Sequence, residues 1–307
     1  MPIYSRKSYS EEFKKNIRIV KMMTRGMAFD ENMSKVNWKA VRLISNIGYT
    51  FMPKEKGIKF YRIQMSHVNA EICVPYDLKE GVIIIYIHGG GFVSGSAGSS
   101  RGYASMLSKC SGYKTITVDY RLAPENKFPY GLKDCYVAYR NISKRYPDSK
   151  IVLVGESAGA NLSIGVALKA GEAGYNNINA VILHSPFIDF SGSIKRDKSL
   201  IDDFTVKEGC LKALKNIYVG NASVKNKYVS PIYATYEGFP ATYITCDENE
   251  TLYADSMILY EKLISFNVNT ILLKYRGTFH AFATIGNGSP ETKQILEDNV
   301  RFINDNL

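Results

Sequence analysis

Hydrophobic and polar residues follow two different patterns along the chain, and the pattern changes near residue 58. In the first 55 residues, apolar side chains recur every three or four positions, at Phe13, Ile17 and Val20 and again from Val36 to Ile47. This spacing is typical of amphipathic helices that bury one face against a partner. We therefore expect the chain to begin with helices.

From Ile58 onward, short runs rich in apolar and β-branched residues alternate with helical stretches. The predicted strands are Ile58–Met65, Glu71–Val74, Val82–Ile87, Lys114–Tyr120, Ile151–Val154, Ala180–Leu183, Ala241–Thr245 and Thr270–Tyr275. The predicted helices are Tyr103–Cys110, Gly131–Tyr146, Ala158–Ala170, Leu252–Phe266 and Glu291–Ile303. Such alternation predicts an α/β fold, with a mostly parallel eight-stranded sheet and helices on both faces.

One segment interrupts the alternation. From about residue 190 to 236 there is no convincing strand, only a helical pattern from Val206 to Tyr218. An insertion here would lie above the carboxyl ends of the strands, where open α/β sheets bind ligands. We expect a single domain, residues 1–307, in which this insertion and the N-terminal segment of about residues 1–55 cover the strand ends as a cap.

Composition narrows the class of protein. Apolar residues make up 45% and charged residues 22%, as in ordinary globular proteins. The longest apolar run, Val82–Ile87, is far shorter than the roughly 20 residues of a membrane-spanning helix. No apolar signal core follows the basic N-terminus, so we expect a cytoplasmic protein.

Neither the net charge nor the cysteines indicate a particular ligand or reaction. The net charge of +10 indicates a solvated basic surface, because no nucleic-acid-binding module accompanies it. The five cysteines are widely spaced and lack a C-x-x-C pair, which favours free thiols. We expect no metal site, since neither the cysteines nor the four histidines have metal-ligand spacing.

The strongest chemical signal is Gly155-Glu156-Ser157-Ala158-Gly159, which matches G-x-S-x-G between a predicted strand and a predicted helix. A sharp turn from strand to helix exposes the Ser157 hydroxyl, and small flanking residues let the neighbouring elements approach. Amides at the start of the helix can stabilise a developing negative charge. We interpret Ser157 as a nucleophile, the alternative being a chance turn of small residues.

A second signal, His88-Gly89-Gly90-Gly91, directly follows the predicted strand Val82–Ile87. Consecutive glycines leave backbone amides free, and an oxyanion formed during attack on an ester needs such donors. We expect the amides of Gly89, Gly90 and Ala158 to form an oxyanion hole. The alternative is a flexible turn, and His88 itself is expected to be structural.

The third signal is His280, in the loop between the last predicted strand and the last predicted helix. A lone histidine is more often structural than catalytic. Of the four histidines, however, His280 is the best general base. His184 lies at the end of a predicted strand, and His67 lies before the functional end of the sheet.

Several motifs together resemble one known family. The segments His88-Gly89-Gly90-Gly91, Tyr120-Arg121-Leu122-Ala123-Pro124-Glu125 and Gly155–Gly159, with the His280 loop, resemble the hormone-sensitive-lipase-like carboxylesterases of the α/β-hydrolase fold. The resemblance runs from about residue 80 to the C-terminus. It implies a serine esterase acting on short acyl chains, with the order Ser, acid, His, a helical cap and no cofactor. Glu156 departs from the family, where Asp is commoner at that position.

The acid of the triad has to be chosen among several carboxylates. The loop Cys246–Asp255 offers four carboxylates, Asp247, Glu248, Glu250 and Asp255. The family usually has an Asp followed two residues later by Leu, and Glu250 with Leu252 fits this pattern. The resemblance therefore implies Glu250, with Asp247 as the alternative. The simplest alternative is that all four carboxylates only cap the next helix.

These residues predict a mechanism. Ser157 attacks the ester, His280 relays its proton to the leaving alcohol, Glu250 orients His280, and water hydrolyses the acyl-enzyme. Two alternatives remain, an amidase or sugar deacetylase on the same fold and a non-catalytic binding protein. The expected partner is a small-molecule ester, with no nucleic acid and no stable membrane insertion, and a homodimer is left open.

Overall fold

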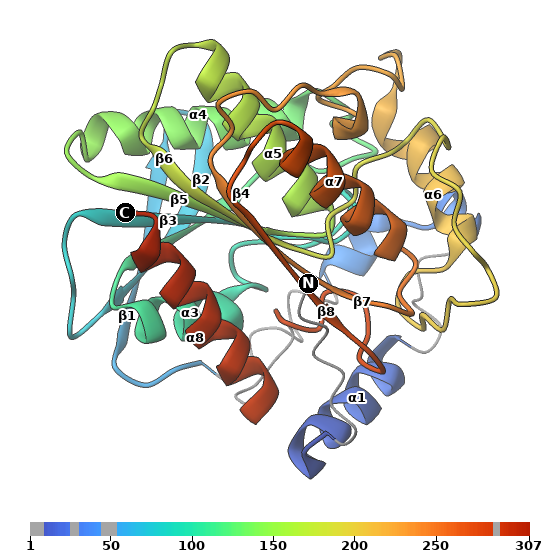
Figure 1. The fold of residues 1–307 in the computed structure, drawn as a ribbon, viewed down its shortest axis with the longest axis horizontal. Helices are drawn as coiled ribbons and strands as arrows, with labels where there is room; N and C mark the ends of the chain where they lie inside the picture. The colour runs from blue at the N-terminus through green and yellow to red at the C-terminus, as the bar shows by residue number, and fades with distance from the viewer. Residues whose placement is uncertain (1–8, 25–30, 44–53, 285–288) are drawn as a thin grey trace.

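The computed structural model describes residues 9–24, 31–43, 54–284 and 289–307. At its centre is an eight-stranded sheet of order β1-β2-β4-β3-β5-β6-β7-β8. The first two pairings, β1 with β2 and β2 with β4, are antiparallel, and all the others are parallel. Figure 1 shows the sheet running through the molecule with helices on either side, so the predicted α/β architecture is confirmed.

The strands lie close to their predicted positions. Their bounds are β1 Ile58–Met65, β2 Val68–Pro75, β3 Val82–Ile87, β4 Lys114–Asp119, β5 Lys150–Glu156, β6 Ile178–His184, β7 Ala241–Asp247 and β8 Thr270–Tyr275. The largest difference is at β2, which begins three residues before the predicted strand. Asn69 there pairs with Gln64 of β1 and Asp119 of β4, so the ladder continues through polar residues.

Two helical layers cover the sheet. One contains α4 (Tyr130–Arg145), α5 (Ala158–Glu172) and α7 (Tyr253–Ser265), and the other contains α3 (Arg101–Ser111), α8 (Pro290–Asp305) and α1 (Glu11–Thr24). The central strand β3 serves both layers. Ile83, Ile85 and Ile87 belong to one hydrophobic core, and Ile84 and Tyr86 to the other. This alternation explains why the strand is apolar throughout.

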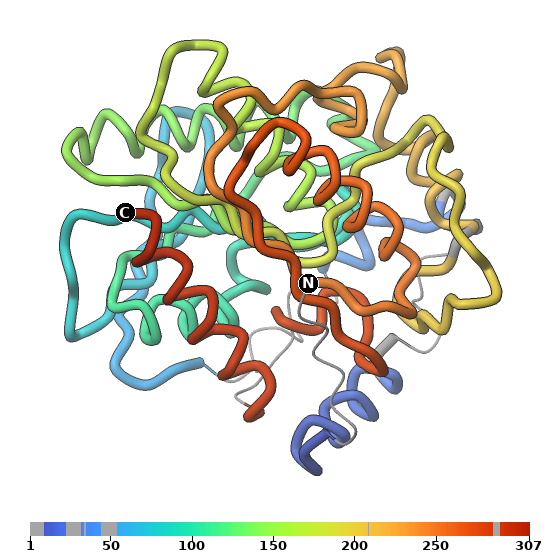
Figure 2. Tube along the Cα trace, in the orientation of Figure 1, coloured from blue at the N-terminus to red at the C-terminus, as the bar shows by residue number. Residues whose placement is uncertain are grey.

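The insertion contains the short helix α6 (Glu208–Leu214), the π-helical turn η2 (Lys215–Val219) and the 3-10 turn η3 (Pro231–Tyr233). Figure 2 shows it as the yellow-to-orange chain along one side of the molecule. Near the N-terminus, the 3-10 turn η1 (Glu31–Lys35) packs against α6. Residues 38–43 are helical, and the rest of the helix predicted up to Ile47 lies outside the described residues.

The N-terminal helix α1 packs against the C-terminal part of the chain. Ser10, just before α1, donates from its backbone N–H and its hydroxyl to the Glu291 carboxylate, over 2.7 and 2.8 Å. The Phe13 ring lies 6.4 Å from the Phe279 ring and 6.0 Å from the Phe282 ring. The first described helix thus supports the loop that carries His280.

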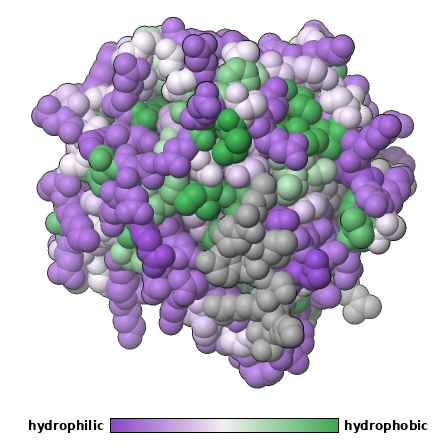
Figure 3. Space-filling view, viewed as in Figure 1, coloured by the Kyte–Doolittle hydropathy of each residue, from purple (hydrophilic) through white to green (hydrophobic). Residues whose placement is uncertain are grey.

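Hydrophilic residues cover most of the face shown in Figure 3, with smaller hydrophobic areas between them. Within the described residues, no helix combines the length and the apolar character needed to span a bilayer.

Candidate active site

Ser157 lies between β5 and α5, at the carboxyl end of the sheet. Its backbone has φ 52° and ψ −117°, a conformation that costs a non-glycine residue about 1–3 kcal/mol and that clusters at functional sites. The surroundings hold this conformation: the Ser157 N–H donates to the His184 carbonyl over 2.9 Å, and its own carbonyl accepts from the Ala160 N–H over 3.1 Å. The side chain stays partly exposed, as a nucleophile requires.

The two glycines of the motif allow β5, α5 and β3 to approach closely. A Cβ on Gly155 would lie 2.5 Å from the Gly159 carbonyl oxygen. A Cβ on Gly159 would overlap the carbonyl oxygens of Ile87 and His88, where β3 ends. Gly159 therefore places the Ser157 turn directly against the loop that follows β3.

That loop, residues 88–91, is fixed by Tyr120. The Tyr120 hydroxyl donates to the carbonyls of His88 and Gly89, over 2.9 and 3.2 Å, and its ring stacks on the His88 imidazole at 4.3 Å. Burial lowers the pKa of His88, whose Nδ1 lies 2.9 Å from the Gly89 carbonyl. His88 therefore has the structural place that the sequence predicted.

The predicted oxyanion donors differ in their surroundings. The Gly89 N–H donates to Oε1 of Glu156 over 3.1 Å. Among the described residues, the N–H groups of Gly90 and Ala158 have no protein acceptor. Gly90 and Ala158 thus present open amides in this structure, whereas the Gly89 amide is engaged by the residue before Ser157.

Glu156 does more than the local hydrogen bonding expected from the sequence. Its second carboxylate oxygen, Oε2, accepts from the Thr284 hydroxyl, at the end of the His280 loop. Burial raises the pKa of Glu156, against the Gly89 N–H and the Tyr86 hydroxyl, which lower it. One side chain therefore links the loop after β3 to the loop after β8.

His280 and Glu250 come together in the structure. His280 is 5% exposed and Glu250 is 2% exposed. Nδ1 of His280 lies 3.8 Å from Oε1 of Glu250, an ion-pair distance that is too long for a hydrogen bond. Nε2 of His280 is buried without a protein partner among the described residues, so it can take a proton from a hydroxyl that comes within reach.

The charges around His280 favour its protonated form. Burial alone lowers the pKa of the imidazole, but the nearby Glu250 carboxylate raises it, helped by Asp203 and Glu156. The net pKa of His280 is above its ordinary value. Burial raises the pKa of Glu250, against the opposing effect of His280.

Asp247, the alternative acid, has a different place. Its Oδ2 accepts from the N–H and the hydroxyl of Thr278, over 2.8 and 2.7 Å, and its Oδ1 accepts from the Asn249 N–H over 2.8 Å. These bonds tie the acid loop to the His280 loop. The structure therefore brings Glu250 within ion-pair distance of His280 and occupies Asp247 with backbone and hydroxyl donors.

Sequence reasoning missed Ser185. This buried residue follows β6 with φ 50°, and its hydroxyl donates to Oε2 of Glu250 over 2.7 Å. The Ser185 hydroxyl oxygen in turn accepts from the Ala281 N–H over 2.9 Å. Ser185 thus holds both the carboxylate and the backbone beside His280. A single serine between a strand and Pro186 gave no signal of this role.

The remaining histidines have structural partners. His184 is fully buried in β6, with Nδ1 2.6 Å from the Thr245 hydroxyl and Nε2 2.9 Å from the Tyr103 hydroxyl. Burial lowers the pKa of His184 to about 3, so it stays neutral. Nε2 of His67 lies 2.9 Å from Oδ1 of Asp134.

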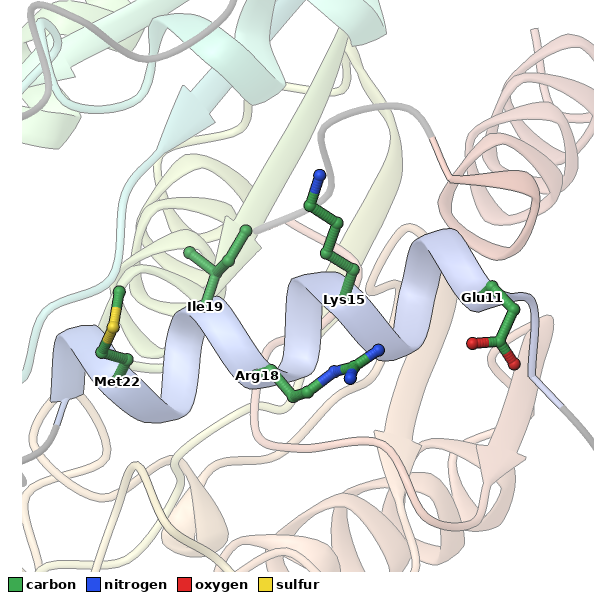
Figure 4. Close-up of a pocket in the computed structure, with 5 residues that line it drawn as sticks. All are labelled: Glu11, Lys15, Arg18, Ile19 and Met22. Atoms are coloured by element: carbon green, nitrogen blue, oxygen red, sulfur yellow. The ribbon is translucent and has the colours of Figure 1, made fainter.

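Surface concavities occur elsewhere. One, of about 540 Å³, is lined entirely by side chains of α1: Glu11, Lys15, Arg18, Ile19 and Met22 (Figure 4). It contains none of the predicted site residues. Its lining comes from one exposed helix, without polar groups converging from several elements, so it lacks the features of a catalytic pocket.

Comparison with known proteins agrees with this geometry. A family model described as alpha/beta hydrolase fold matches residues 84–284. A putative acetyl-hydrolase of Mycobacterium tuberculosis is 23% identical over 244 residues, covering 79% of each chain. An esterase of Acinetobacter venetianus is 27% identical, covering 72% of this chain and 74% of its own. An FAD-linked oxidoreductase of Aspergillus terreus is 28% identical over 245 residues, but this chain spans only 30% of its length.

Solved structures extend the similarity to nearly the whole chain. A hormone-sensitive lipase from a metagenome library has a TM-score of 0.84 and 27% identity, covering 95% of this chain and 99% of its own. An esterase from the bacterial hormone-sensitive lipase family has a TM-score of 0.86 and 25% identity, covering 97% and 99%. The chain belongs to the hormone-sensitive-lipase-like carboxylesterases of the α/β-hydrolase fold, a family of carboxylic ester hydrolases.

Proposed function

We propose that this chain is a serine carboxylesterase that hydrolyses short-chain acyl esters through Ser157, His280 and Glu250. The observation that carries the proposal is the pairing of buried His280 with buried Glu250 at 3.8 Å, in a chain whose Ser157 has the strained backbone of a nucleophile turn. Ser157 attacks the carbonyl carbon while Nε2 of His280 takes the hydroxyl proton. Glu250 stabilises the imidazolium that results.

The tetrahedral intermediate carries a negative oxygen that needs donors. The open amides of Gly90 and Ala158 supply two, and Gly89 supplies a third when Glu156 releases it. His280 then donates its proton to the leaving alcohol, which departs as the acyl-enzyme forms. Water, deprotonated by His280, hydrolyses the acyl-enzyme and restores Ser157.

The names of relatives support a small acyl group. One is an acetyl-hydrolase of Streptomyces hygroscopicus, and another is a versiconal hemiacetal acetate esterase of Emericella nidulans. A solved relative, 26% identical, was soaked with p-nitrophenyl butyrate. The acetyl-hydrolases keep deacetylation of a small or sugar substrate as the second candidate function.

We further propose that α1 and the insertion form a cap within the single domain. The contacts of Phe13 and Phe204 with the Phe279 ring, beside His280, support this cap. Deleting residues 1–24 should expose that aromatic cluster and sharply reduce activity or solubility. A deletion variant with unchanged stability and acyl-length preference would contradict the cap.

The function is tested by p-nitrophenyl esters of two to twelve carbons and by labelling with an organophosphate. We expect the highest kcat/KM at short acyl lengths and a label on Ser157, located by peptide mass spectrometry. Ser157→Ala should lose about 10⁴–10⁶ in turnover with its circular dichroism unchanged. An active, folded Ser157→Ala protein contradicts the mechanism, and a preference for ten carbons or more contradicts the short acyl group.

A further inference from the structure

A segment of the insertion, residues 200–206, is hydrogen-bonded to the loop that carries Glu250. On one side of Glu250, the Asn249 side chain donates to the Leu200 carbonyl over 2.8 Å, and the Asn249 carbonyl accepts from the Asp202 N–H over 2.9 Å. On the other side, the Thr251 hydroxyl donates to the Val206 carbonyl. The insertion therefore holds the residues that flank Glu250 on both sides.

Of the two aspartates in this segment, Asp203 is the one whose carboxylate is bonded to the acid loop in the described residues. Its Oδ2 accepts from the Thr251 N–H over 3.0 Å. Its Oδ1 accepts from the N–H and the hydroxyl of Thr205, over 2.9 and 2.7 Å, and from the Val206 N–H over 3.1 Å. Because both oxygens are bonded, the carboxylate is fixed as a bridge between its own turn and the acid loop.

The neighbouring Phe204 contacts the other catalytic loop. Its ring lies 5.3 Å from the Phe279 ring, directly before His280, and the Lys21 ammonium lies 4.9 Å from the Phe204 centroid. Two consecutive residues of the insertion thus meet the acid loop and the histidine loop. Any displacement of this segment would act on both.

The charge of Asp203 also reaches the proposed triad. It raises the pKa of Glu250 and of His280. The other ionised groups acting on His280 are Glu250 and Glu156. Burial raises the pKa of Asp247, and the charge of Asp203 raises it further. Asp203 is therefore a negative charge near the catalytic pair that does not contact His280 itself.

We propose that Asp203 is a positioning residue that fixes the Glu250 loop and adds negative charge near His280, and so couples the insertion to the catalytic pair. The proposal rests on the proposed function, because it gives Asp203 a role only if Glu250 and His280 act together. It is carried by the bridge from Asp203 to Thr251 and by the bonds on both sides of Glu250.

The chain offers a matched control. Asp197, in the same insertion, accepts from the N–H and the hydroxyl of Ser199, over 3.0 and 2.7 Å, as Asp203 does from Thr205. Asp197 is exposed, and no described bond joins its side chain to the acid loop. Asp197→Asn removes the same charge from the same kind of turn, and we expect it to behave like the wild type.

The test compares Asp203→Asn, Asp203→Glu and Asp197→Asn in kcat, KM and the pH profile of kcat/KM, with thermal stability measured alongside. In Asp203→Asn one carboxylate oxygen becomes an NH₂ group, which cannot accept from the donors on that side. We expect kcat to fall on the order of 10-fold, with KM changed by less than about 2-fold. The acid limb should move down by roughly half a pH unit. Asp203→Glu keeps the charge, so its acid limb should stay at the wild-type pH.

Three results would overturn the inference. The first is a wild-type pH profile and kcat in Asp203→Asn, and the second is an equal change in Asp197→Asn. The third is lost stability in Asp203→Asn and Asp203→Glu with unchanged kcat per folded molecule. Glu250→Gln, measured in parallel, separates this inference from the proposed function. If Glu250→Gln is inactive while Asp203→Asn is normal, only the inference fails, whereas an active Glu250→Gln removes the proposed triad itself.

Discussion

The Gly89 N–H donates to the carboxylate of Glu156 over 3.1 Å, so the residue before the proposed nucleophile holds an amide of the proposed oxyanion loop. The other oxygen of the same carboxylate accepts from the Thr284 hydroxyl. From the end of β5, the Glu156 side chain thus connects the loop that precedes α3 with the loop that precedes α8. The spacing between the proposed oxyanion donors and His280 thus depends on one side chain.

Glu156→Gln should therefore be tolerated and Glu156→Ala should not. The glutamine carbonyl can accept from Gly89 while its amide group donates to the Thr284 hydroxyl, so we expect kcat within about 3-fold of wild type. In Glu156→Ala both contacts are lost, which should cost about 1–3 kcal/mol of stability and roughly 10-fold in kcat. Urea unfolding and ester kinetics measure the two effects. Equal kinetics in both variants would show that the bridge has no catalytic effect.

Glu250→Gln should mainly lower turnover, whereas Asp247→Asn should mainly lower stability. Glu250→Gln removes the charge that stabilises the imidazolium, at an expected loss of about 10²–10⁴ in turnover. Asp247→Asn places an amide NH₂ against the N–H donors of Thr278 or Asn249, which should lower stability by about 1–3 kcal/mol. Kinetics should be normalised to folded enzyme by active-site titration. The reverse pattern, with Asp247→Asn crippled and Glu250→Gln nearly normal, would assign the acid to Asp247.

Activity should be lost on the acid side at a higher pH than an unperturbed histidine would give. His280 accepts a proton only when neutral, and its pKa is above the usual value because Glu250, Asp203 and Glu156 together outweigh burial. Activity should therefore fall as the pH drops through a midpoint above about 6.5, the unperturbed histidine pKa. Glu250→Gln should lower this midpoint in its residual activity. Enzyme held at each pH and returned to pH 8 for assay controls for unfolding. A wild-type midpoint well below 6.5 would contradict the charge environment described.

The buried ion pair between Arg196 and Asp255 should contribute to the stability of the fold. Arg196, in the insertion, donates to Oδ2 of Asp255 in α7 over 3.1 and 2.7 Å, and the Ile188 N–H donates to Oδ1 over 3.1 Å. Arg196→Met leaves a buried carboxylate without its partner, at a cost of about 3–5 kcal/mol near pH 8.

The pKa of Asp255 decides how the destabilisation by Arg196→Met changes with pH. Burial raises its pKa to about 6, against the effect of Arg196, so removing Arg196 raises the pKa further. Protonation then neutralises the stranded group, and the destabilisation of Arg196→Met should shrink as the pH falls from 8 to 5. Arg276→Met removes an exposed arginine from Glu248, which keeps Lys274 at 3.6 Å, so this control should cost only about 0–1 kcal/mol. A loss for Arg196→Met that is the same at both pH values would contradict the assignment.

The sheet could be predicted from the sequence because most strands are marked by a local run of apolar residues. The residues of β3 are apolar on both faces, and the glycines beside Ser157 mark a close crossing that no larger residue allows. The start of β2 gave no such signal, since Asn69 is held there by pairing with β1 and β4 rather than by an apolar pattern. Local composition therefore predicts where a strand lies better than where it begins.

The supporting residues of the site could not be found in the same way. Ser185 meets Glu250 from 65 positions away in the sequence, and Asp203 meets Thr251 from 48. Such contacts depend on how β6, β7 and the insertion are placed in space. A serine or aspartate that also fits an ordinary turn does not reveal a distant partner. The turn at Ser157 is predictable because its signal is local, whereas the residues that hold Glu250 are brought to it by the fold.

The packing of α1 against the far end of the chain sets an order for maturation during synthesis. The ribosome completes the Ser157 turn and the loop after β3 long before it makes His280, and Phe13 must wait for Phe279 and Phe282 to emerge. Contacts across so many residues form late and slowly. Until the residues around Phe279 have left the ribosome, a nascent chain therefore has the proposed nucleophile without the proposed base. We therefore expect hydrolysis to begin only after α1 has packed against the His280 loop.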